Sequence, residues 1–186
     1  MTSIDSREAA SALSDISEIA RRVRQSTIYN IASLMLIMWG ALVFAGHIVA
    51  HAFPRSALLI WLAVNVLGCA GAFAISAATR ARTGVRSFDA RFLTAFLLFL
   101  GFGYLWTLGL GHFTPRQLDT FWPLYFMLVY TIVGLWVGLA FVAIGLGITA
   151  LTLIGYFFVG GDWFHLWMAV VNGGGLMLGG LWMRRS

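Results

Sequence analysis

The sequence predicts an all-α membrane protein: a six-helix transmembrane bundle of three hairpins, preceded by an N-terminal cytoplasmic amphipathic helix. Three observations support this class. The 186-residue chain is 60% hydrophobic and only 10% charged, whereas a soluble domain carries about 25% charged residues. Its long apolar runs lack the polar face of a soluble helix. Its basic residues flank these runs and form no basic patch, so we expect no nucleic-acid partner despite the net charge of +5.

Six apolar stretches are expected to cross the bilayer, each near the roughly 20 residues that span about 30 Å of hydrocarbon. They cover residues 28–52, 57–79, 90–111, 121–138, 142–159 and 164–183. No charged residue lies between Thr120 and Gly161, so no arginine marks the turn between the fourth and fifth spans. An even number of crossings is predicted, because a single crossing there would place Arg184 and Arg185 outside.

The arginines set the predicted orientation, since an excess of Arg and Lys marks the cytoplasmic side. Only Arg55 and Arg116, among the 12 basic residues, fall on the outer side of this arrangement. The other side carries Arg7, Arg21, Arg22, Arg24, Arg80, Arg82, Arg86, Arg91, Arg184 and Arg185. The prediction is a multi-pass protein embedded in the lipid bilayer of a bacterial inner membrane, with both termini cytoplasmic.

Two domains are expected, residues 1–27 and residues 28–186. Residues 5–25 have the pattern of an amphipathic helix, with acidic residues early and arginines late, as the helix dipole favours. Its apolar stripe is Leu13, Ile16, Ala20 and Val23. One interpretation is an anchor that fixes the topology. The other is a docking helix for a cytoplasmic protein partner.

The first and second outer turns share the pattern H-x-x-P-R, at His51–Arg55 and at His112–Arg116. This predicts duplicated hairpins in which residues 36–61 superpose on residues 97–122. The structural alternative is that proline ends a helix and that arginine and histidine suit the membrane interface.

All four histidines fall at or near the predicted outer face, in one layer with Arg55, Arg116 and Asp119. His47 and His51 share one face of a helix because they are four residues apart. Imidazole suits transition metals, and two imidazoles can ligate haem. The candidate metal ligands are His47, His51, His112, His165 and Asp162. A pH-responsive surface and a plain interfacial layer are the alternatives.

Neither a transporter nor an enzyme has a clear signature. Apart from Arg91 at the start of the third, no charged residue lies inside an expected span, although ion-driven transporters place ionisable groups there. Asn65 and Asn172 are the notable polar core residues, either lining a neutral path for a small solute or joining helices by hydrogen bonds. No nucleotide-binding loop, nucleophile elbow or HExxH helix is present. The leading hypothesis is a non-enzymatic protein that binds a partner or senses a signal.

Small residues at helical spacing predict close helix packing. The pairs are Gly134 with Gly138, Gly175 with Gly179, and Gly68 with Ala72. They indicate seams within the bundle or, alternatively, faces that form a homo-oligomer.

Two further segments are notable. The carboxyl end runs from Phe164-His165 through Asn172-Gly173-Gly174-Gly175 to Arg184-Arg185, and the first span contains Trp39-Gly40. With the arginine-rich start, this resembles an uncharacterised family of small bacterial six-transmembrane-helix membrane proteins. The resemblance implies the membrane fold and no activity.

Overall fold

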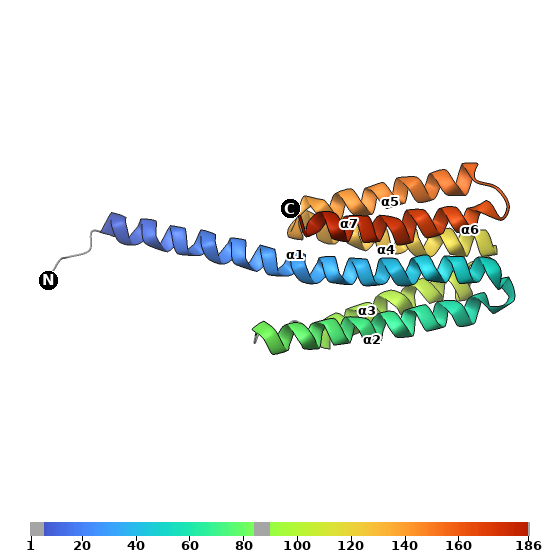
Figure 1. Ribbon diagram of the computed structural model, residues 1–186, viewed down its shortest axis with the longest axis horizontal. Helices are drawn as coiled ribbons and strands as arrows, with labels where there is room; N and C mark the ends of the chain where they lie inside the picture. The colour runs from blue at the N-terminus through green and yellow to red at the C-terminus, as the bar shows by residue number, and fades with distance from the viewer. Residues whose placement is uncertain (1–5, 84–89, 186) are drawn as a thin grey trace.

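The computed structural model describes the backbone of residues 6–83 and 90–185, with the side chains of residues 15, 29–81, 91 and 94–185. It is all-α, and six helical rods follow one another in alternating directions along the described chain (Figure 1). The first rod is α1 (Ser6–Ala52), and the second is α2 (Ala57–Thr83), which follows the short 3-10 turn η1 (Pro54–Ser56). The third rod is α3 (Ala90–Tyr104) with its π-helical continuation η2 (Leu105–Leu110); the fourth and fifth are α4 (Pro115–Val137) and α5 (Leu139–Phe158). The last rod consists of α6 (Trp163–Met168), the π-helical η3 (Ala169–Gly174) and α7 (Gly175–Met183).

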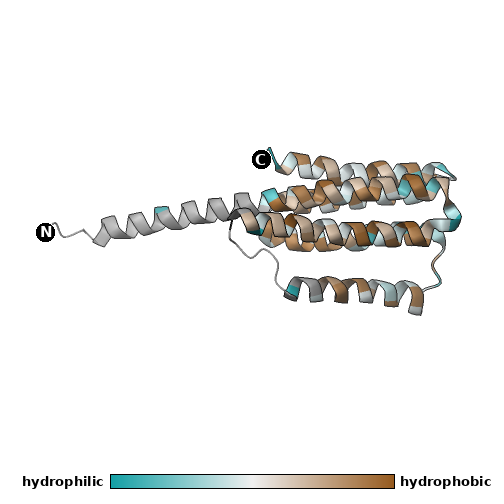
Figure 2. Cartoon of the chain, turned by 60° about the horizontal axis from the view of Figure 1, so that its bottom comes forward, coloured by the Kyte–Doolittle hydropathy of each residue, from teal (hydrophilic) through white to brown (hydrophobic). Residues whose placement is uncertain are grey.

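The helices are those of a multi-pass membrane protein. In the described ranges, five helices are long and apolar enough to cross a membrane. They cover Tyr29–Ala52, Pro54–Ala81, Pro115–Val137, Leu139–Phe158 and Trp163–Met183. The third rod has a shorter apolar part, Thr94–Leu110. Figure 2 shows apolar residues along most of each rod and polar residues mainly near the ends. The membrane class is therefore confirmed, whereas a sixth full crossing stays a prediction.

Helix α1 has no break between the predicted cytoplasmic helix and the first span. It runs for 47 residues, about 70 Å at the usual rise per residue. Its first half projects beyond the other rods (Figure 1). The apolar stripe predicted for residues 5–25 lies outside the described side chains.

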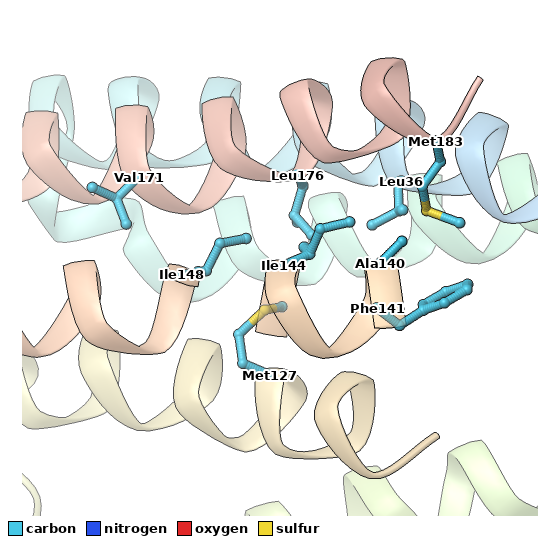
Figure 3. Packing of buried hydrophobic residues seen from close by; sticks show 9 residues of the cluster. All are labelled: Leu36, Met127, Ala140, Phe141, Ile144, Ile148, Val171, Leu176 and Met183. Atoms are coloured by element: carbon cyan, nitrogen blue, oxygen red, sulfur yellow. The ribbon is translucent and has the colours of Figure 1, made fainter. Parts of the chain in front are cut away.

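The core lies where α1, α4, α5 and the last rod meet (Figure 3). Helix α1 packs against α2 and against the last rod, and α4 packs along α5. The buried cluster comprises Leu36, Met127, Ala140, Phe141, Ile144, Ile148, Val171, Leu176 and Met183. This packing places the C-terminal end of α1 close to the first turns of α4 and α6.

The predicted glycine seams are used within the chain. A Cβ atom added at Gly134 would lie 2.7 Å from the backbone nitrogen of Val142 in α5. Additions at Gly175 and Gly179 would meet the side chains of Ile148 and Ile144, also in α5. These glycines therefore bring α4 and α7 close to α5.

Helices α4 and α5 both begin before the predicted fourth and fifth spans. Helix α4 begins at Pro115, six residues before 121, because Thr114 and Gln117 form a capping box and proline suits the first helical turn. Helix α5 begins at Leu139, because Gly138 alone makes the turn with a φ of +157°. A side chain at Gly138 would also collide with the Tyr29 hydroxyl.

The predicted duplication of the first two hairpins is also wrong. Only Phe53 separates α1 from η1, whereas residues 111–114 separate η2 from α4. Helix α1 ends at Ala52, one residue after the histidine of its motif, whereas η2 ends at Leu110, two residues before the histidine of the second motif. The two loops therefore differ in length. What the two motifs share is a proline that starts the next helix.

Candidate functional site

Polar side chains from three helices gather where α1, α4 and α6 approach one another at the end of the bundle that carries the Phe53 turn. His47 and His51 lie one turn apart near the end of α1, and His165 lies in the first turn of α6. Asp119 comes from the start of α4. We call these four residues the histidine cluster. Members on different helices lie between 46 and 118 residues apart in the sequence, so only the tertiary fold brings them together.

His47 is the most unusual member of the cluster. Its side chain is 1% exposed, and neither ring nitrogen has a hydrogen-bond partner. The edge of its ring faces Trp61 of α2, with 4.8 Å between the ring centroids. His47 is therefore buried between helices near the end of α1, with Trp61 of α2 and His165 of α6 beside its ring.

His165 lies at the centre of the cluster. Its ring centroid is 6.5 Å from that of His47 and 6.2 Å from that of His51. Its Nδ1 atom lies 3.6 Å from Oδ2 of Asp119, which is beyond hydrogen-bonding distance. Nδ1 is buried and has no hydrogen-bond partner. The cluster therefore places the carboxylate of Asp119 beside the imidazole of His165. The more deeply buried imidazole of His47 has no such carboxylate beside it among the described side chains.

Arg116, next to the cluster, binds the C-terminal end of α5. Its Nη2 atom donates hydrogen bonds to the backbone oxygens of Gly155, at 3.2 Å, of Tyr156, at 2.7 Å, and of Val159. Its guanidinium also lies 4.4 Å from the ring centroid of Phe164. The carbonyls of Tyr156 and Val159 lie at the end of α5, where helical N–H partners run out, and that of Gly155 also accepts from the backbone N–H of Val159. Arg116 thus caps α5 and holds the turn into α6.

Two predicted cluster residues stay outside it. His112 and Asp162 are exposed and make no contact with the cluster among the interactions seen for the described side chains. Arg55 is also exposed, so the two arginines of the shared motif differ in role. Within the described residues, no three His, Cys, Asp or Glu side chains are arranged to hold a metal ion. The metal and haem hypotheses therefore gain no support from the geometry.

The two core asparagines belong to different helices. The Asn65 amide donates to the carbonyl of Trp61 in its own helix α2 at 2.8 Å. Asn172 is buried in η3, where its Oδ1 accepts from Thr152 of α5 at 3.4 Å. Asn172 therefore joins two helices, as one of the predicted interpretations requires. A neutral solute path through both residues stays a prediction.

Trp61 contributes to the site in a way that sequence patterns did not reveal. Trp61 has the pattern of an interfacial aromatic, yet it covers His47. Asp119 lies in the first turns of α4, a position that the capping-box spacing from Thr114 to Gln117 signals.

Comparison with known proteins adds no relative. No protein-family model matches the chain, and neither a curated protein nor a solved structure shows significant similarity. The function is therefore argued from the histidine cluster itself.

Proposed function

We propose that this integral membrane protein is a non-enzymatic sensor whose conformation responds to protonation of the histidine cluster. The observation that carries the proposal is the buried His47 ring with both nitrogens unpartnered. Buried polar side chains are hydrogen bonded in most proteins, and exceptions call for an explanation. An ionisable side chain within a membrane-spanning helix is by default a candidate functional group.

Protonation would change the balance of charges between α1 and α6. An unperturbed imidazole changes charge between about pH 5 and 8, and burial away from a counter-charge moves this change to lower pH. A protonated His165 has the carboxylate of Asp119 beside it, at 3.6 Å. A protonated His47 has no such neighbour, and its ring is 6.5 Å from that of His165. Two positive charges at this distance repel by about 2–3 kcal/mol at an effective dielectric constant of about 20.

The helices give this repulsion a direct mechanical route. His47 lies on α1, which continues as one helix to Ser6 at the opposite end. A shift of α1 against α6 would therefore move the N-terminal half of α1, which projects beyond the other rods (Figure 1). We propose that this half contacts a cytoplasmic protein partner and passes the signal to it.

Acidification is expected to separate the ends of α1 and α6. Spin labels at Phe53→Cys and Trp163→Cys, in a Cys69→Ala background, report this distance because both positions are exposed. Because burial without a counter-charge disfavours a protonated imidazole, pulsed electron resonance should show a longer distance only well below about pH 5, relative to about pH 8. The response should vanish in His47→Gln and persist in His112→Gln, which alters an exposed histidine at the same end. An unchanged distance in the parent protein at both pH values contradicts the sensor proposal.

We further propose six crossings of a bacterial inner membrane with both termini in the cytoplasm. The exposed arginines Arg80, Arg91, Arg184 and Arg185 lie at the end of the rods where the C-terminus lies (Figure 1). Such residues favour the cytoplasmic side. Reporter fusions at Ser186 and near Ser56 should report cytoplasm and periplasm respectively. A periplasmic report at Ser186 would mean that one of the rods does not cross.

A further inference from the structure

We propose that the histidine cluster binds one small tetrahedral hydrogen-bond donor, a water molecule or an ammonium ion, between the imidazoles of His47 and His165. The proposal concerns the same site as the sensor proposal and names its occupant. It does not require that the protein change shape, so the two can fail separately.

The unpartnered nitrogens are the first support. Both ring nitrogens of His47 and Nδ1 of His165 are buried without a hydrogen-bond partner. Leaving a buried donor or acceptor unsatisfied costs about 1–3 kcal/mol each. A molecule bound between the rings relieves this cost for one nitrogen of His47 and for Nδ1 of His165, and buried waters in proteins commonly serve such groups. Because the unpartnered atoms belong to α1 and α6, the occupant would bridge these two helices.

The ring spacing is the second support, and it separates a hydrogen-bonded ligand from a metal. The centroid of His165 lies 6.5 Å from that of His47 and 6.2 Å from that of His51. A tetrahedral atom that hydrogen bonds to two facing imidazole nitrogens at about 2.9 Å holds the centroids about 6.6 Å apart. A tetrahedral metal ion bonded at about 2.0–2.1 Å holds them only about 5.2 Å apart. The observed spacing matches the hydrogen-bonded bridge.

The surrounding charges accept a neutral or singly positive occupant. His51 of α1 and Asp119 of α4 both lie near His165, and they add an imidazole and a carboxylate as possible acceptors. Helix α2 contributes Trp61, which does not titrate. The remaining charged neighbour, Arg116 of α4, is bound to three backbone oxygens of the α5 end. The guanidinium of Arg116 is therefore already engaged and is not available to an anion. A hydrogen-bond donor, by contrast, can bind the imidazole nitrogens and the Asp119 carboxylate.

Nuclear magnetic resonance of ¹⁵N-histidine-labelled protein tests the proposal directly, because the chain has 4 histidines. Ring-nitrogen shifts distinguish a hydrogen-bonded acceptor nitrogen from a bare one. We expect a hydrogen-bonded nitrogen in His47, assigned through His47→Gln, and loss of that bond in His165→Phe, which removes the other side of the bridge. The exposed His112 serves as the internal control. Bare acceptor nitrogen in the parent protein overturns the proposal, and so does a His47 hydrogen bond that survives His165→Phe.

Ammonium and water are separated by a titration at fixed pH and ionic strength. Ammonium chloride should shift the His47 and His165 signals in a saturable way, relative to sodium chloride, if ammonium is the occupant. If the hydrogen-bonded shift is present and ammonium changes nothing, water occupies the bridge. A pH-dependent helix movement without any bridge would leave the sensor proposal standing and remove this one.

Discussion

Replacement of Arg116 by Leu is expected to lower the free energy of unfolding by about 3 kcal/mol or more, because hydrogen bonds to charged groups contribute about 1.5–3 kcal/mol each. The guanidinium donates to Gly155, Tyr156 and Val159, and leucine would remove the donor to all three carbonyls, of which only that of Gly155 keeps a backbone partner, the N–H of Val159. It would also lose the cation–π contact with Phe164. In a chain of this size the melting temperature should fall by about 6–12 °C, measured by differential scanning fluorimetry in detergent.

Arg55→Leu is the matched control, because Arg55 occupies the same position in the other H-x-x-P-R motif but is exposed. Its replacement should change stability by no more than about 0.5 kcal/mol. Arg116→Lys should fall between the two, since a single ammonium group reaches fewer carbonyls than a guanidinium. Equal melting temperatures for Arg55→Leu and Arg116→Leu would show that the cap of α5 contributes nothing.

The contrast between these two arginines shows where sequence patterns stop being informative. Composition and arginine placement were enough to predict an all-α membrane protein, because hydrophobic length and flanking charge are local properties. The shared motif also predicted that Pro54 and Pro115 start helices. It could not predict that one arginine reaches the end of α5, since that contact spans about 40 residues.

The histidine cluster was predictable only in part, because some of its contacts are local in the sequence and others depend on helix packing. The spacing of His47 and His51 places them on one helix face, and that part is local. Which histidines meet depends on how α6 packs against α1, so His165 joined the cluster while His112 did not. The burial of His47 depends on Trp61, whose pattern matched an interfacial aromatic.

Helix packing was also predictable only where the residues involved lie close together in the sequence. Paired glycines four residues apart correctly marked the α5 seams, because such spacing exposes a strip of backbone. The tight crossing of α1 over η3 depends on Gly40 and Gly173, which come from separate helices and form no such pair. The π-helical register of η3 also has no sequence signature that periodicity would detect.

Gly173→Ala is expected to be strongly destabilising, whereas Gly174→Ala should be tolerated. A Cβ atom at Gly173 would lie 2.5 Å from Cβ of Phe44 and 2.6 Å from its Cα and nitrogen. Because these are backbone atoms and Cβ of α1, no side-chain rotation relieves the clash, and the two helices must separate. Overpacking of this kind costs about 1–3 kcal/mol, and we expect a value near the upper end.

Gly174 provides the comparison within the same π-helical segment. A Cβ atom there would meet no atom within 4 Å, so alanine should be neutral or stabilise the helix by up to about 1 kcal/mol. Melting temperatures of both variants in detergent test the difference. The Gly173→Ala variant should also lose the pH-dependent change in the spin-label distance, because Phe44 and His47 are on adjacent turns of α1 and move together. If both variants melt like the parent protein, α1 and η3 do not cross as closely as the structure indicates, and the contact between His47 and His165 would lose its basis.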